Sequence, residues 1–490
     1  MKRTAVINVV GLSESLLGPH TPAINAFRQS GALATIKPAF PAVTCTAQSD
    51  YLTGRTPSEH GIVGNGWYSR ELAEVQFWKQ SNHLVTAPKI WDELRASQPG
   101  FTCAKLFWWF NMHSTADWSI TPRPMYPADG RKLFDIHAWP HSIRTEIKRD
   151  LGEFPFFGFW GPAAGVDTPQ GKADAVSRWI AEAAKWIENK FSPTLSLVYL
   201  PHLDYNLQRH GPLLEGRAGC PQPAASADDG AVGTPRPTNP IITRDLELID
   251  AIVGELIAFF RERGVQVLLL SEYGISAVNQ PVHLNRLFRE RGWLTVKEEL
   301  GLELLDAGAS RAFAVADHQV AHIYVNDRAI LEDVRVAVEK TDGVAQVWGD
   351  AQKKANGFDH PRAGDLVAVA RENAWFTYYY WLDDARAPAF ARTVDIHRKP
   401  GYDPVELFLD PKLCCPKLKI AWRLLQKKLG FRMLMDVIPL DATLVKGSHG
   451  CQPANRAEWP LIIAEKPDLL QRPLLNSTDV YSVIKSAVVS

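Results

Sequence analysis

The chain has 490 residues, 46% of them hydrophobic, and its 54 lysines and arginines balance 54 aspartates and glutamates. A chain of this length and composition can bury a large core, which excludes an intrinsically disordered protein. The zero net charge excludes a global attraction to a nucleic acid polymer or an acidic membrane, so any partner must be recognised by a local patch.

The first residues and the cysteines predict the cellular compartment. Met1–Thr4 lead directly into a predicted strand, without the apolar segment and cleavage site of a secretory signal, and no apolar run is long enough to span a bilayer. The six cysteines are irregularly spaced and form no C-x-x-C pair, which predicts free thiols. We therefore expect a soluble, cytoplasmic protein without a transmembrane segment.

Short apolar runs alternate with helix-period segments through the first 270 residues. This alternation predicts a doubly wound α/β fold with a mainly parallel sheet and helices on both faces. Val6, Leu197 and Val267 are expected to lie in strands of that sheet. The segments that carry the pattern are strands at 6–10, 103–107, 195–200 and 265–270, and helices that begin near 22 and 87 and cover 176–187 and 248–260.

Residues 40–54 predict a strand end, a tight turn and a helix closed by Gly54. Pro41 ends the extended run, and Thr44 and Thr46 are good N-cap residues. The free N–H groups and the positive dipole end of such a helix would hold an anion such as phosphate against Thr44. An ordinary capped helix is the competing interpretation.

The rest of the chain divides by composition. Residues 1–278 form the predicted core, within which 211–240 is rich in Gly, Pro, Ala and Asp and predicts a mobile insertion. We expect late core strands plus an inserted cap over 279–440, and a segment that closes the core over 441–490. Residues 412–432 combine cationic and apolar residues in a basic amphipathic helix. Such a helix either packs its apolar side on the body or lies on a membrane surface.

Polar residues follow several of the predicted strands, where open α/β sheets collect their ligands. Asp204 and Glu272 come directly after two apolar runs, and His449 lies in a Gly-Ser-His-Gly segment. Together with the order of the first hundred residues, these motifs resemble the alkaline phosphatase superfamily, specifically its nucleotide pyrophosphatase/phosphodiesterase branch. The resemblance implies that Thr44 is a nucleophile that attacks phosphorus between two metal ions, usually zinc. It also implies that Asn65 contacts a phosphoryl oxygen.

The resemblance assigns the metal ligands only in part. Asp204 and His449 match ligand positions, and Glu272 keeps a carboxylate that is one methylene longer than the family's aspartate. Val10, Gln208 and Tyr273 stand where the family has an aspartate and two histidines. We therefore expect Asp204, Glu272 and His449 to converge beside Thr44 and hold at most one tightly bound divalent ion, with zinc as the first candidate and manganese or magnesium as alternatives.

A second polar cluster offers replacement ligands or substrate contacts. Asp395, His397 and Asp403 carry metal-ligating groups, and Arg398 and Lys399 carry cations suited to a phosphate or carboxylate. A salt-bridged turn is the competing interpretation. Within the motif that begins at Asp204, Gln208 and the nearby His210 are further candidates, whereas Asp317, His318 and His322 are interpreted as structural residues.

The predicted function is a metal-dependent hydrolase of phosphodiester or pyrophosphate bonds in a small phosphorylated molecule, acting through Thr44. One alternative is a catalytically degenerate family member that binds a phosphorylated ligand or a partner without turnover. A phosphotransferase or mutase on the same fold is the other. The sequence leaves the substrate open.

Overall fold

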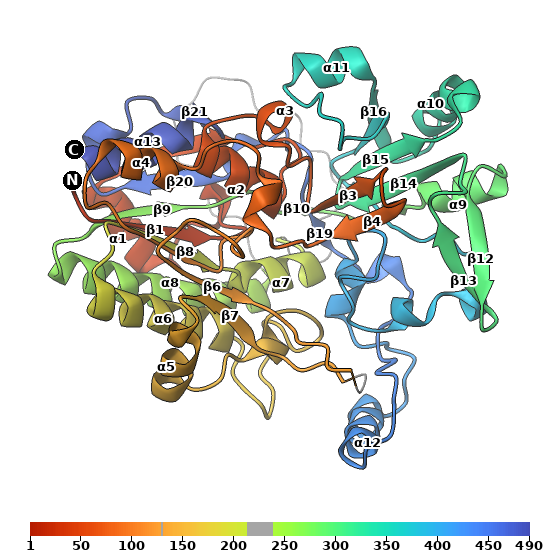
Figure 1. Ribbon diagram of the computed structural model, residues 1–490, viewed down its shortest axis with the longest axis horizontal. Coiled ribbons are helices and arrows are strands. Elements are labelled where there is room, and N and C mark those ends of the chain that lie inside the picture. The colour runs from red at the N-terminus through yellow and green to blue at the C-terminus, as the bar shows by residue number, and fades with distance from the viewer. Residues whose placement is uncertain (129–130, 213–238) are drawn as a thin grey trace.

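A nine-stranded, mostly parallel sheet forms the centre of the computed structural model, which describes residues 1–128, 131–212 and 239–490 (Figure 1). The strand order is β21-β2-β20-β9-β1-β8-β5-β6-β7. The strands are β1 (Thr4–Val9), β2 (Ala32–Lys37), β5 (Cys103–Leu106), β6 (Trp118–Pro122), β7 (Ile136–Trp139), β8 (Leu195–Leu200), β9 (Gln266–Leu270), β20 (Leu461–Ala464) and β21 (Leu474–Asn476). Nearly all of the predicted insertion at 211–240 lies outside the described residues.

The middle strands are apolar because both of their faces are buried. Val6 on β1 pairs with Leu197 on parallel β8, and β1 also pairs in parallel with β9, which contains Val267. All three side chains are fully buried. The predicted strand positions and the α/β class are therefore confirmed.

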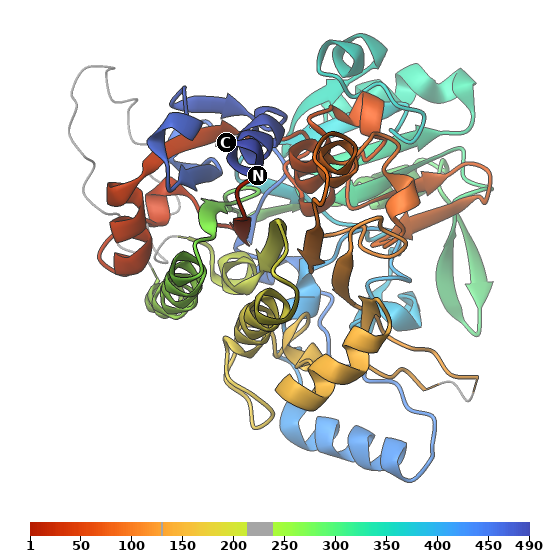
Figure 2. The same cartoon turned by 60° about the vertical axis from the view of Figure 1, so that its left-hand side comes forward.

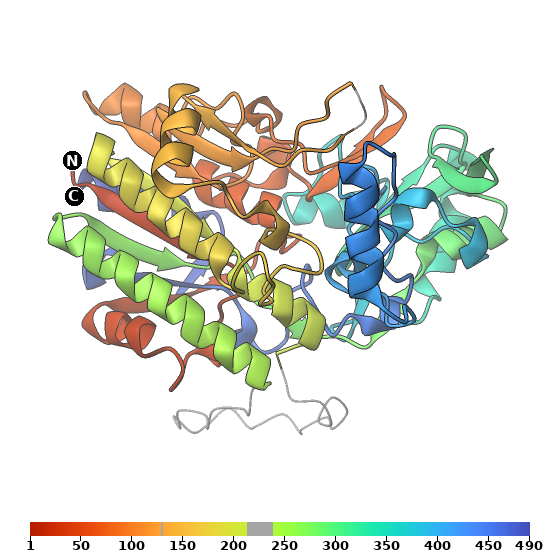
Figure 3. The ribbon, with the colours of Figure 1, turned by 90° about the horizontal axis from the view of Figure 1, so that it is seen from below.

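Helices cover both faces of the sheet, as the alternating pattern predicts. On one face, α13 (Asp479–Val489) packs on β1 and contacts α2 (Thr44–Thr53) and α4 (Ile90–Ser97). On the other face, long helices run across the sheet, and Figure 3 shows them side by side. The helices of that face are α1 (Pro22–Ser30), α5 (Ser142–Leu151), α6 (Ala175–Phe191) and α8 (Pro240–Glu262).

Residues 279–440 build a second lobe with its own hydrophobic core. The prediction of late core strands is wrong, because in the described chain the nine-stranded sheet takes no strand from this stretch. The lobe contains β11 (Gln280–Val282), α9 (Leu284–Glu290), β12 (Thr295–Glu299), β13 (Leu302–Asp306), β14 (Ala312–Asp317), β15 (Val320–Val325), α10 (Leu331–Glu339), β16 (Val344–Trp348), α11 (Asp350–Ala355), β17 (Leu366–Ala370) and β18 (Ala374–Phe376). Its hairpins β12–β13 and β14–β15 are each closed by a short turn, which favours antiparallel pairing over a return to a parallel sheet.

Two strand pairings lie where the lobes meet. The ribbon of β3 (Gly66–Ser69) and β4 (Glu74–Phe77) leaves the region of α2 and contacts β14 of the second lobe (Figure 1). Near the end of the chain, β19 (Gly447–Ser448) pairs antiparallel with β10 (Ser276–Ala277). This pairing brings the segment that contains His449 beside the end of β9.

Candidate active site

Thr44 is the first residue of α2, so the predicted helix start is confirmed. The predicted capping role is wrong, because the N-cap is Val43 and no side chain caps this end. The helix ends at Gly54, whose positive φ of 65° suits glycine. Thr44 is 5% exposed, and its hydroxyl points away from the helix backbone into a polar cluster.

A chain of hydrogen bonds leads from Thr44 to Asp204. The Tyr273 hydroxyl donates to Asp204 Oδ1 at 3.2 Å, and Thr44 Oγ1 lies 3.2 Å from the same phenol oxygen. Because a phenol has one proton, Tyr273 accepts from Thr44 while it donates to Asp204. The arrangement forms a directed path from the threonine hydroxyl to a carboxylate.

Asp204 lies in the first turn of α7 (His202–His210), directly after β8. Gln208, one turn further along the helix, donates from Nε2 to Asp204 Oδ2 at 2.8 Å. The hydroxyl of Tyr402 donates in turn to Gln208 Oε1 at 2.9 Å. Burial raises the pKa of Asp204 to about 7. His210 is the last residue of α7.

His449 is a neutral imidazole in this cluster. Its Nδ1 donates to the backbone oxygen of Ala42 at 2.7 Å, which leaves a lone pair on Nε2. That nitrogen is buried without a hydrogen-bond partner and lies 3.9 Å from Asp204 Oδ1. Burial, reinforced by the nearby His318, lowers the pKa of His449 well below its ordinary value.

Glu272 is fully buried and hydrogen-bonded to amides rather than to cations. Its Oε1 accepts from Asn8 Nδ2 at 2.6 Å and also from Gln48 Nε2. Burial raises the pKa of this carboxyl to about 8. Glu272 is therefore held as one member of an amide-carboxyl network beneath α2.

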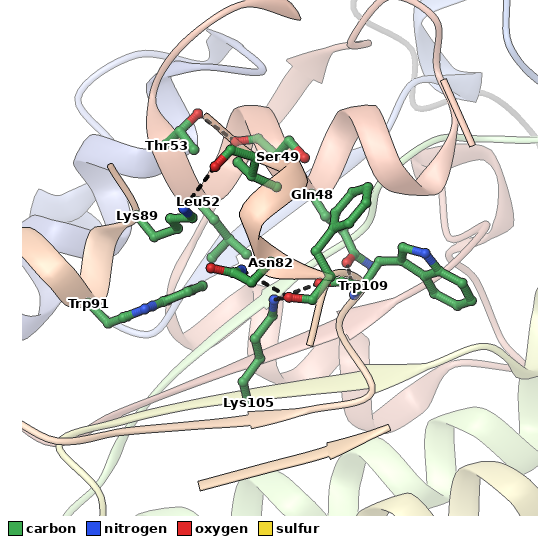
Figure 4. Close-up of a pocket in the computed structure, with 11 residues that line it drawn as sticks. Gln48, Ser49, Leu52, Thr53, Asn82, Lys89, Trp91, Lys105 and Trp109 are labelled. Atoms are coloured by element: carbon green, nitrogen blue, oxygen red, sulfur yellow. Dashed lines mark hydrogen bonds between the residues drawn. The ribbon is translucent and has the colours of Figure 1, made fainter. Parts of the chain in front are cut away.

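Gln48 and Lys105 extend this network, and sequence reasoning did not select either of them. Gln48 Oε1 accepts from the backbone N–H of Trp109, and Lys105 Nζ donates to the carbonyls of Trp109 and Phe110 at 2.5 and 3.0 Å. Figure 4 shows these groups around a cavity of about 10 Å³. Burial lowers the pKa of Lys105 to about 7. A lone lysine within an otherwise apolar strand was the available signal.

Asn65 lies next to the start of α2. Its Oδ1 accepts from the Cys45 backbone N–H at 3.1 Å, and its Nδ2 donates to Asp317 Oδ1 at 3.1 Å. Asp317 also accepts from the Asn65 backbone N–H at 2.7 Å. The amide is thus fixed in place, and the second N–H on Nδ2 is available to a ligand.

His318, interpreted from sequence as structural, lies within the site. Its Nδ1 donates to Asp317 at 2.8 Å, and its ring stacks on Tyr402 at 3.6 Å and lies 3.8 Å from the ring of His449. Its Nε2 is buried without a partner. His322 is structural as expected, because its two nitrogens bond to the backbone of Val63 and Gly364.

The cluster at 395–403 contributes a different residue from those predicted. Lys399 pairs with Asp403 and Glu406 at 2.7 Å each, all three buried, so these charges satisfy one another. Arg398 is exposed and lies 3.6 Å from Asp395. His397 is a neighbour of Lys132 and Lys79 rather than of Asp204. Tyr402 is the residue of this segment that enters the site.

The side chains do not fit the two-metal centre that the resemblance implies. Val10 is a fully buried core residue, Gln208 is bonded through both ends of its amide, and Tyr273 lies between Thr44 and Asp204. Among the described residues, no group of three or more His, Cys, Asp or Glu could hold a metal ion. Asp204 and His449 lie next to each other, but Glu272 does not form a three-ligand metal site with them.

The chain matches the family of type I phosphodiesterases and nucleotide pyrophosphatases over residues 4–403. It belongs to this family, which confirms the resemblance, and it is a phosphodiesterase-like hydrolase. No curated protein matches the chain.

Solved structures share the fold over nearly the whole chain. Phosphonoacetate hydrolase from Sinorhizobium meliloti, in complex with phosphonoformate, has 14% identity and a TM-score of 0.58, covering 99% of this chain and 96% of that one. Murine ectonucleotide pyrophosphatase/phosphodiesterase 5, an inactive variant in complex with AMP, has 13% identity and a TM-score of 0.54, covering 100% and 95%. The human counterpart has 13% identity and a TM-score of 0.56, covering 99% and 95%.

Proposed function

We propose that the chain hydrolyses a phosphorus ester of a small molecule, with Thr44 as the nucleophile and Tyr273 and Asp204 as the path for its proton. The observation that carries the proposal is the directed hydrogen-bond chain Thr44 to Tyr273 to Asp204, with 3.2 Å at each step. A threonine hydroxyl is a weak nucleophile unless a base removes its proton. The hydrogen-bond path from Thr44 ends at the carboxylate of Asp204, which can act as that base.

The reaction proceeds in two balanced steps. Thr44 Oγ1 bonds to phosphorus as the bond from phosphorus to the leaving oxygen breaks. The threonine proton moves to Tyr273, the Tyr273 proton moves to Asp204, and Asp204 returns a proton to the leaving oxygen. Water then attacks the phosphothreonine in the reverse sense, which restores the Thr44 hydroxyl and releases the second product.

Two groups support an anionic phosphoryl group beside Thr44, and a third accepts a proton. The first turn of α2 presents the positive end of its dipole, and Asn65 has an N–H that the protein leaves unused. The unpartnered Nε2 of His449 is an acceptor for the proton of an attacking water or of a substrate hydroxyl. The small ligands of the structural neighbours, AMP and phosphonoformate, favour a small phosphorylated substrate.

The metal dependence expected from the resemblance is not part of this proposal. The phenol of Tyr273 replaces a histidine ligand and bonds the two groups, Thr44 and Asp204, that metals hold in the family. In place of a Lewis acid, the protein supplies a proton path and a helix terminus.

Binding without turnover is the second candidate, and one observation favours it. Thr44 is 5% exposed, Tyr273 2% and Asp204 8%. The three side chains of the proposed proton path are therefore almost completely shielded from solvent. A degenerate site that retained only ligand recognition would show the same closure.

A panel of phosphomonoesters, phosphodiesters, pyrophosphates and phosphonates, assayed with EDTA and again with zinc, manganese or magnesium, separates the candidates. The proposal predicts product formation in EDTA and a phosphothreonine at Thr44 in quenched reactions examined by mass spectrometry. Saturable AMP binding by calorimetry with no product from any substrate would assign the chain to the binding class. Turnover that strictly requires added metal would contradict the proton path.

A further inference from the structure

Helix α12 (Pro416–Lys428) projects from the body on the second-lobe side, clear of the central sheet (Figures 1 and 2). It is attached through its cationic side. Lys419 and Arg423 contact Asp436 at 2.9 and 3.0 Å, and Ile420 packs at the edge of the core of the second lobe. No residue of this helix is buried.

The opposite side of α12 is an apolar stripe exposed to solvent. Leu418, Trp422, Leu425 and Leu429 recur at the helical spacing that places them on one face, and they are 70%, 58%, 45% and 63% exposed. The sequence left open whether the apolar side packs on the body. In the structure the helix does the reverse, with paired cations turned inward and large apolar side chains turned outward.

The charge around the stripe has one sign. Residues 411–435 contain seven lysines and arginines and no aspartate or glutamate, although the whole chain has no net charge. Two of the seven are paired with Asp436, whereas Lys417, Lys427 and Lys428 on the helix are exposed. Helices that lie in a membrane interface typically carry leucine and tryptophan on one face and lysines beside that face.

A second exposed apolar segment faces the same side. The connection between β6 and β7 exposes Met125, Tyr126 and Phe134 by 40%, 59% and 36%, and Lys132 lies over the rings of Tyr126 and Phe134. In Figure 1 this connection runs toward α12 at the lower edge of the molecule. The two exposed apolar segments therefore lie near each other.

We propose that α12, together with Met125, Tyr126 and Phe134, docks on the surface of an anionic lipid bilayer, with the α12 stripe inserted among the headgroups. A bilayer supplies the apolar layer and the negative charge together, and the membrane-spanning length that α12 lacks is not needed. A second copy of this chain would set the exposed Lys417, Lys427 and Lys428 against the same three residues, which disfavours self-association through this face. This proposal does not depend on the proposed hydrolysis.

The test is co-sedimentation of the full-length protein with vesicles of phosphatidylcholine alone or mixed with phosphatidylglycerol. The wild type should bind the mixed vesicles, bind neutral vesicles weakly, and lose binding at high salt. The triple variant Lys417→Glu, Lys427→Glu, Lys428→Glu should lower the affinity at least about tenfold. Its matched control reverses three exposed lysines elsewhere: Lys37→Glu, Lys340→Glu and Lys354→Glu.

A second variant pair separates insertion from charge attraction. Leu418→Gln, Trp422→Gln and Leu425→Gln together should also abolish binding to mixed vesicles, whereas Leu72→Gln, Leu300→Gln and Leu382→Gln, equally exposed in other segments, should not. Circular dichroism confirms that each variant is folded. Equal binding to neutral vesicles, or unchanged binding by either α12 variant, would overturn the proposal. A wild-type dimer in sedimentation velocity that the Leu418, Trp422 and Leu425 variant dissociates would assign the face to a second copy instead.

Discussion

The ring of Tyr273 lies parallel to the imidazole of His449, with the centroids 3.6 Å apart and the planes at 7°. This stacking fixes the direction of the phenol, whose oxygen reaches Thr44 on one side and Asp204 on the other. A histidine at the same position would offer a lone pair to a metal, whereas in the proposed mechanism the phenol relays a proton.

Replacing Thr44 with alanine should abolish phosphothreonine formation and lower kcat by orders of magnitude. The stability cost should be small, on the order of 1 kcal/mol, because the hydroxyl is a neutral hydrogen-bond partner of Tyr273 and does not cap the helix. Thr44→Ser is the matched control, since it keeps the hydroxyl and should retain much of the activity. Equal activity of Thr44→Ala and wild type would remove Thr44 from the mechanism.

Tyr273→Phe should keep the stacking on His449 and break the proton path. We expect kcat to fall by roughly 10²-fold or more, the size of effect that positioned proton transfer contributes. Tyr51→Phe removes a buried hydroxyl that bonds the backbone of Ser271 close to the site but outside the path, and it should leave kcat nearly unchanged. Steady-state kinetics of both variants, with melting temperatures, test this; equal losses in the two would indicate a structural effect.

Restoring two histidines should create zinc affinity that the wild type lacks. In Gln208→His with Tyr273→His, two imidazoles would join Asp204 and His449, the donor types and number that zinc prefers. Isothermal titration with zinc should show a new tight site in the double variant, and hydrolysis without metal should be lost. A double variant that binds zinc no better than wild type would show that backbone positions, rather than side-chain types, prevent metal binding.

Lys105 should make stability depend on pH in a defined direction. Its pKa is about 7 in the folded chain against an ordinary value of 10.5, so the unfolded chain binds more protons between these values. Stability therefore rises with pH over this window, by about 1.4 kcal/mol per pH unit from this residue alone. The difference in unfolding free energy between wild type and Lys105→Met should follow that slope from pH 7 to pH 9 in urea titrations. Exposed Lys340→Met is the control, and a flat difference for Lys105→Met would contradict the assignment.

The fold was predictable because its signal is local. The runs around Val6, Leu197 and Val267 are apolar over whole strands, and ligand-bearing residues of such sheets follow the strand ends, which located Asp204 and Glu272. The late core strands were misassigned because an apolar run such as Val320–Val325 gives the same pattern in a central sheet and in a separate antiparallel sheet.

The contacts that define the site are long-range, and no local pattern reveals them. Gln48 meets Glu272 across 224 residues, and Tyr402 meets Gln208 across 194. His318 was interpreted as structural because its segment resembles the family only loosely, yet the fold places it against His449. A substituted ligand such as Tyr273 can be recognised from sequence as a departure, but its new partners cannot.

Metal stoichiometry tests the central claim that Tyr273 and its partners replace a two-metal centre. The protein should be purified from zinc-supplemented culture without chelators, and its zinc, manganese and magnesium measured by inductively coupled plasma mass spectrometry against protein concentration. The expected result is fewer than one tightly bound ion per chain, with hydrolysis unchanged after EDTA. Two equivalents of tightly bound zinc, removed by EDTA together with the activity, would contradict the account.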